Sequence, residues 1–148
     1  MSERKQNKKI DKRAPVIVGV GDLVDRSKED GLNPQELLAK ACEHAIQDSG
    51  IKELNKHIDY VGVVRFTVDF LTATNQSNFQ YSNFPRTLAN KLNVSAKNEV
   101  YAPMGGNSPQ VLLEDALVKI SAGETDCALL TGGEALQTMI AKLKAGMS

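Results

Sequence analysis

Apolar and polar residues follow one another along this chain of 148 residues in blocks that predict strands and helices in turn. Four short apolar runs predict strands, at residues 14–24, 58–66, 99–103 and 126–131, and the first is typical of a strand buried on both faces of a sheet. The segments between them place apolar residues at helical spacing. This alternation predicts an α/β fold in which layered helices pack on a mixed, mostly parallel sheet.

The first helix has clear start and stop residues. Asn33 is a suitable N-cap, Pro34 suits the first helical position, and Glu36 would complete a capping box. Gly50 is expected to end the helix. The positions predicted to face the core are Leu38, Ala41, Cys42, Ala45 and Ile46.

Three further segments have a similar pattern. After a predicted loop over residues 67–82, Asn83 begins a short helix with apolar residues at Phe84, Leu88 and Leu92. Ser108 and Pro109 then suit the cap and first position of a longer helix that ends at Gly123. Its predicted inward residues are Val111, Leu113, Ala116, Leu117 and Ile120. A last apolar stripe consists of Leu136, Met139, Ile140 and Leu143.

Charge and composition narrow the possible functions. Eighteen basic residues balance eighteen acidic ones, so no global field favours nucleic acid or an anionic membrane. Residues 1–13 are locally basic with few apolar positions, which predicts a disordered tail ahead of one domain over residues 14–148. No run approaches the length of a membrane span and no apolar leader is present, so we expect a cytoplasmic protein.

The candidate reactive groups are few. Cys42 lies in a helical pattern and Cys127 in an apolar run, and their spacing suggests neither a disulfide nor a metal site. His44 is expected at the surface. The strongest local signal is the strand-to-helix turn "YAPMGGNSPQ" at residues 101–110, because such turns present backbone amides or a nucleophile.

Four motifs closely resemble the N-terminal half of thiolases, specifically the thiolase-like acetyl-CoA acetyltransferase group. They are "APVIVGVGD", "AIQDSGI", "IDYVGVV" and, as the most specific, "AGETDCALLTGGEA". The resemblance extends from residue 14 to about residue 146. It implies a chain that handles acyl-CoA thioesters, with no cofactor beyond the CoA thioester and no metal.

The resemblance also implies where a nucleophilic cysteine would stand. In that family the nucleophile lies in the turn at the start of the helix, where the helix N-terminus favours a thiolate. The corresponding position here is Gly106, within about one residue, so we predict no catalytic residue in this chain. Ser108 is the nearest hydroxyl, and we interpret it as a helix cap. The predicted substrate-binding residues are Gly105, Gly106, Asn107 and Ser108.

Two interpretations remain open. In the first, the chain is the N-terminal portion of a thiolase-like acyltransferase, with no activity as an isolated chain because the family's acid/base cysteine and histidines belong to the other half. In the second, it is a non-catalytic module that binds acyl-CoA or a partner. Residues 98–103 resemble the family's dimer-edge strand, so the expected partners are acyl-CoA and a second copy, or a second chain that supplies the missing half.

Overall fold

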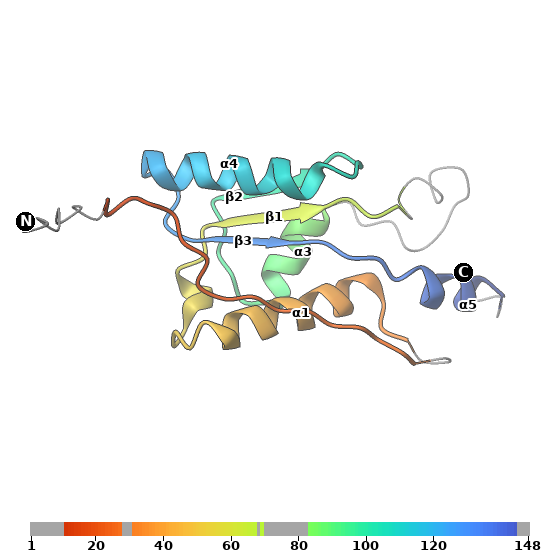
Figure 1. Ribbon diagram of the computed structural model, residues 1–148. Coiled ribbons are helices and arrows are strands. Elements are labelled where there is room, and N and C mark those ends of the chain that lie inside the picture. The colour runs from red at the N-terminus through yellow and green to blue at the C-terminus, as the bar shows by residue number, and fades with distance from the viewer. Residues whose placement is uncertain (1–10, 28–30, 68, 70–82, 145–148) are drawn as a thin grey trace, which may run out of the picture.

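The computed structural model describes residues 11–27, 31–67, 69 and 83–144, without the side chains of Met139, Lys142 and Leu143. In this part of the chain, three parallel strands form a sheet in the order β2-β1-β3. Figure 1 shows α4 on one face of the sheet and α1 with α3 on the other. The elements are α1 (Pro34–Asp48), a short 3-10 helix η1 (Leu54–Lys56), β1 (Tyr60–Val64), α3 (Phe84–Lys91), β2 (Asn98–Ala102), α4 (Ser108–Ala122), β3 (Ala128–Thr131) and α5 (Leu136–Lys144).

Three of the four predicted strands are confirmed, and a buried carboxylate joins their starting ends. The Asp59 carboxylate accepts hydrogen bonds from the amides of Asp126 and Cys127, both at 3.2 Å. Its carbonyl accepts from the amides of Lys97 at 2.8 Å and Asn98 at 3.0 Å. Asp59 therefore fixes the entry of the chain into β1, β2 and β3 at once.

The predicted capping box of α1 is confirmed. The Asn33 side chain accepts from the Glu36 amide at 2.9 Å, and the Asn33 amide donates to the Glu36 carboxylate at 3.2 Å. Gly50 follows the helix with a φ of 65°, a left-handed conformation that glycine adopts at low cost. Leu38 and Cys42 are buried as predicted, while Ala41, Ala45 and Ile46 are half-buried.

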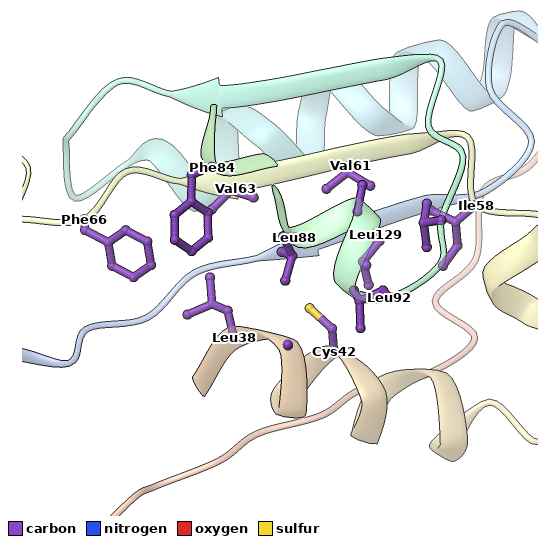
Figure 2. Close-up of a cluster of buried hydrophobic side chains, with 13 residues drawn as sticks. Leu38, Cys42, Ile58, Val61, Val63, Phe66, Phe84, Leu88, Leu92 and Leu129 are labelled. Carbon is purple, nitrogen blue, oxygen red and sulfur yellow. The ribbon is translucent and has the colours of Figure 1, made fainter. Parts of the chain in front are cut away.

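The main core lies between α1, α3 and the sheet. Figure 2 shows Leu38 and Cys42 extending from α1 toward Val61, Val63 and Leu129 of the sheet. Phe66 and Phe84 meet edge to face, with ring centroids 4.7 Å apart. The predicted α3 stripe of Phe84, Leu88 and Leu92 is fully buried in this cluster. Burying each such side chain contributes about 1.5–3 kcal/mol, so this cluster is the main anchor of α1 and α3.

Helix α4 corrects two predictions. Ser108 is the first helical residue and does not cap, because Asn107 occupies the N-cap position without a side-chain hydrogen bond. The buried residues are Leu112 and Ala116, whereas Val111, Leu113 and Leu117, predicted inward, are exposed. Apolar residues occur around most of the helix, so periodicity alone did not select the face that meets the sheet.

The predicted first strand, residues 14–24, is wrong for this structure. The segment is extended but has no strand partner among the described residues, and Val16 and Ile17 are 76% and 78% exposed. It lies instead against α1, where the Val20 amide donates to Asp48 at 2.9 Å. A strand requires a neighbouring ladder, and none of the described strands is close enough to supply one.

The remaining predictions concern helix α5, the N-terminal tail and the loop over residues 67–82, and the structure describes only part of these segments. Helix α5 forms as its pattern predicts, with Leu136 and Ile140 exposed. The predicted tail lies mostly, and the predicted loop over residues 67–82 almost wholly, outside the described residues. Among the helices that the structure describes, none is long and apolar enough to span a membrane.

Candidate functional site

The carboxyl ends of the three parallel strands meet at one edge of the sheet. Residues 65–67 follow β1, residues 103–107 follow β2, and residues 132–134 follow β3. A hollow of about 400 Å³ opens there, bounded by the ends of β1 and β3 and by Pro109 and Leu112 of α4. Ligands of open α/β sheets bind at this edge, so the hollow is the candidate site.

The turn predicted to bind substrate adjoins this hollow through Pro109. The Ser108 amide donates to the Gly105 carbonyl at 3.0 Å, and the Ser108 hydroxyl donates to the Pro103 carbonyl at 2.6 Å. Ser108 is buried, and both of its donors are used inside the turn. It is therefore a structural residue of the turn, neither a cap nor a free nucleophile.

The other predicted residues of the turn are exposed. Within the described part of the chain, the amides of Gly105, Gly106 and Asn107 donate to no protein group. These amides lie at the N-terminal end of α4, where the helix dipole favours negative charge. The turn can therefore offer donors to a carbonyl oxygen or a carboxylate.

Gly106 stands in open space. A Cβ atom built on it has no neighbour within 4 Å among the described residues, and its φ is not in the left-handed region. At Gly105 the nearest atom to such a Cβ is the Asn107 side-chain oxygen at 3.1 Å, again without a left-handed φ. Neither glycine is required by the backbone, so a side chain at position 106 would point into free volume.

Two contacts between distant residues shape the same edge. Glu134 accepts from both the amide and the hydroxyl of Thr67 at 2.7 Å, which joins the segments after β1 and β3. The Arg65 guanidinium lies over the Tyr101 ring at 4.5 Å. No pattern in the sequence indicated either contact, because the partners are far apart in the chain and their residue types are common on surfaces.

Tyr101 is a further residue that the sequence did not single out. Its hydroxyl donates to Asp69 at 2.6 Å. Burial and the Asp69 carboxylate raise its pKa well above the ordinary value. Tyr101 therefore stays protonated and positions the chain after β1.

Neither cysteine is poised as a nucleophile. Burial raises the pKa of the Cys42 thiol to about 11, despite a hydrogen bond with Thr131. Cys127 lies just before β3 and is half-buried; burial and the nearby carboxylates of Asp59 and Asp126 raise its pKa. A thiol with a raised pKa is mostly protonated at neutral pH and reacts slowly.

Both histidines, His44 and His57, are exposed, and neither lies in the hollow. Among the residues that the structure describes, no three histidine, cysteine, aspartate or glutamate side chains gather into a group that could hold a metal ion. The arrangement at the strand ends therefore consists of backbone donors, an apolar hollow and polar contacts at its rim. It can bind a group, but it has no activated nucleophile.

Comparison with known proteins supports the fold. No protein-family model and no curated protein matches this chain. Among solved structures, it is similar to a crystal structure of a monomeric SCP2-thiolase like protein type 1 from Mycobacterium smegmatis, at 32% identity with a TM-score of 0.69. The match includes 84% of this chain but only 24% of that protein's chain. On this similarity, the chain has a thiolase-like α/β fold.

Proposed function

We propose that this chain is the N-terminal portion of a thiolase-like acyltransferase, and that it contributes an acyl-CoA-binding surface without a nucleophile. The observation that carries the proposal is the open space at Gly106, the position that the resemblance assigns to the nucleophile. The nearby Ser108 hydroxyl is engaged, and both thiols have raised pKa values. The isolated chain therefore forms no covalent acyl intermediate.

Binding uses the unpaired amides at the start of α4. Oriented backbone donors at a helix N-terminus stabilise an oxyanion or a carboxylate without reorganisation. The hollow beside Pro109 has apolar walls at Val64, Leu112 and Leu130, which suit the acyl part of a thioester. The carbonyl oxygen of the thioester would lie against the amides of Gly106 and Asn107.

The test is calorimetric titration of CoA and acetyl-CoA into the wild type and Gly106→Ala. Since an added Cβ meets no atom of the described residues within 4 Å, the variant should keep the fold, and its side chain would occupy the ligand's place. We expect about tenfold weaker acetyl-CoA binding, equivalent to about 1.4 kcal/mol. Ser121→Ala, exposed at the far end of α4, is the matched control and should bind as the wild type does.

Two outcomes contradict the proposal. If the folded wild type binds neither CoA nor acetyl-CoA, the site does not exist in this chain. Equal binding by Gly106→Ala places the site elsewhere. In parallel, intact-mass spectrometry after incubation with acetyl-CoA should find no acyl adduct, and a stoichiometric adduct on Cys42, Cys127 or Ser108 would refute the assignment of the missing nucleophile.

A second candidate is a partner-binding module of the same fold. Val111 and Val118, two turns apart on the outward side of α4, are 48% and 62% exposed. An apolar helix face without a covering element is typical of an interaction surface. This candidate predicts function through association and no acyl-CoA binding, so the same titration separates the two.

Self-association and location belong to the same proposal. Strand β2 lies at one edge of the described sheet, with β1 as its one neighbour, and could pair with a second copy. Sedimentation at tens of micromolar should then reveal a dimer, whereas a monodisperse monomer would contradict it.

Two free cysteines without a disulfide agree with the cytoplasmic location that we propose.

A further inference from the structure

Arg65 places a positive charge at the rim of the hollow beside Pro109. It follows β1 directly and lines the hollow together with the apolar side chains of Val64, Leu112 and Leu130. The Arg65 side chain is exposed. Within the part of the chain that the structure describes, it forms no ion pair and donates no hydrogen bond. The charge at this rim is therefore not neutralised by a carboxylate of the protein.

The ring of Tyr101 holds the Arg65 guanidinium, which lies 4.5 Å from the ring centroid. The Tyr101 hydroxyl donates to Asp69 at 2.6 Å and accepts from the Phe66 amide at 3.4 Å. On its other side, the ring stacks with Phe84 at a centroid distance of 6.0 Å and an interplanar angle of 13°. Phe66 and Phe84 belong to the main core (Figure 2). The surface that supports Arg65 is therefore anchored in the core.

This arrangement prepares Arg65 to bind an anion. Stacking on an aromatic ring uses the flat face of a guanidinium and leaves the N–H donors at its edge free. These donors form a fork that matches a carboxylate or a phosphate with two parallel hydrogen bonds. Because Tyr101 already restrains the side chain, little rotamer freedom is lost when a ligand binds.

Glu134 is the one acidic residue among the described residues that line the hollow. Its carboxylate accepts from the amide and the hydroxyl of Thr67, both at 2.7 Å, and it forms no ion pair with Arg65. Arg65 follows β1, whereas Glu134 comes after β3. An anionic group of a ligand is therefore attracted at the β1 side of the hollow and repelled at the β3 side, which orients the ligand.

The proposed function indicates which part of the ligand meets Arg65. With the thioester carbonyl against the amides of Gly106 and Asn107, the acyl chain extends into the hollow. The CoA phosphates lie on the other side of the thioester. The anion that Arg65 meets therefore belongs to the acyl group. A hollow of about 400 Å³ also falls within the range of small-molecule pockets, about 300–1,000 Å³.

We propose that the hollow selects acyl groups that end in a carboxylate, and that Arg65 is the specificity-determining residue that binds this carboxylate. The inference rests on the proposed acyl-CoA binding at the turn, and it deepens that proposal by naming the substrate class. The ligands are CoA thioesters of dicarboxylic acids. The apolar walls pack against the methylene groups, and the Arg65 guanidinium binds the terminal carboxylate.

The experiment is calorimetric titration of the full chain with glutaryl-CoA and with pentanoyl-CoA, whose acyl chains have equal length and differ in the terminal carboxylate. The wild type should bind glutaryl-CoA about tenfold more tightly, as expected for a hydrogen-bonded charge pair. Arg65→Gln should lose this preference and bind pentanoyl-CoA as the wild type does. Arg65→Lys keeps the charge without the fork, and its preference should be intermediate.

Arg26→Gln is the matched control, because Arg26 is exposed, does not line the hollow and carries the same charge. It should keep the wild-type preference. Thermal unfolding of each variant shows that the fold is retained, as expected for exposed side chains.

The inference is overturned if the wild type binds the two thioesters equally, or if Arg65→Gln keeps the preference. Equal weakening of both thioesters by Arg65→Gln would show that Arg65 binds a CoA phosphate, and would overturn it too. So would loss of the preference in Arg26→Gln, because net charge would then explain it. These outcomes leave acyl-CoA binding intact, whereas a folded wild type that binds neither thioester refutes the proposed function and this inference with it.

Discussion

Placing a thiol at position 106 tests whether the turn can support a nucleophile. In Gly106→Cys the new Cβ meets no atom of the part of the chain that the structure describes within 4 Å, and the backbone φ suits any residue. We expect a free energy of unfolding equal to that of the wild type or up to about 1 kcal/mol higher, because losing a glycine reduces the entropy of the unfolded chain. A clear loss of stability would refute the geometry of the turn.

The expected reactivity follows from the pKa values. An unperturbed thiol of pKa about 8.5 is about 10% ionised near pH 7.5, roughly 300 times more than a thiol of pKa about 11. The greater nucleophilicity of the more basic thiolate offsets about 13-fold of this difference. On pKa alone, the thiol of Gly106→Cys should thus react about 20 times faster than the thiol of Cys42. The burial of Cys42 should slow the alkylation of that thiol further.

The assay is alkylation by iodoacetamide with peptide mapping by mass spectrometry. Ser121→Cys, exposed near the C-terminal end of the same helix, is the matched control. Its thiol should have the higher pKa of the two, because the helix dipole favours a thiolate at the N-terminus and disfavours it at the C-terminus. Equal pKa values in the two variants, or alkylation of Gly106→Cys no faster than of Cys42, would refute the reasoning.

Three further predictions concern stability. Asp59→Ala should lower the free energy of unfolding by about 3 kcal/mol in urea denaturation, because the amides of Asp126 and Cys127 lose a charged acceptor; a loss below about 1 kcal/mol would contradict this. Gly123→Ala should lower it by about 1 kcal/mol, since φ is 76° there, and no change would count against a left-handed cap. Because the Cys42 thiol has a raised pKa, its contribution to the free energy of unfolding is complete well below pH 9.0 and is lost as the pH rises through about 11; between pH 9.0 and 11 the wild type should lose about 2 kcal/mol more than Cys42→Ala, and parallel pH profiles would exclude this role.

Local sequence signals predicted most of the fold correctly. The start of α1 was predicted from Asn33, Pro34 and Glu36. The ends of α1 and α4 were predicted from Gly50 and Gly123. These predictions succeeded because helix caps depend on residues within one turn of each other. The apolar runs gave β1, β2 and β3. The turn after β2 was located correctly. A strand pattern ends and a helix pattern begins within a few residues that include two glycines and a Ser-Pro pair, so few other positions for the turn are possible.

The candidate site could be predicted only in part. The sequence located the turn at residues 105–108, but the contacts of Glu134 with Thr67 and of Arg65 with Tyr101 join residues more than 30 positions apart. The role of Ser108 was also misread. A serine hydroxyl at this position could either cap the helix or donate to a nearby carbonyl. In the folded turn the Pro103 carbonyl lies within reach, and the Ser108 hydroxyl donates to it.

What the sequence by itself determined is therefore the helices and three of the four predicted strands, because capping and periodicity are short-range properties. The tertiary structure decided which side of α4 is buried, because that helix is apolar around most of its surface and the sheet contacts Leu112 and Ala116. It also decided that residues 14–24 form no strand. A strand exists only through hydrogen bonds to a neighbour, and in the described structure a cleft of about 960 Å³ stands where that neighbour would be.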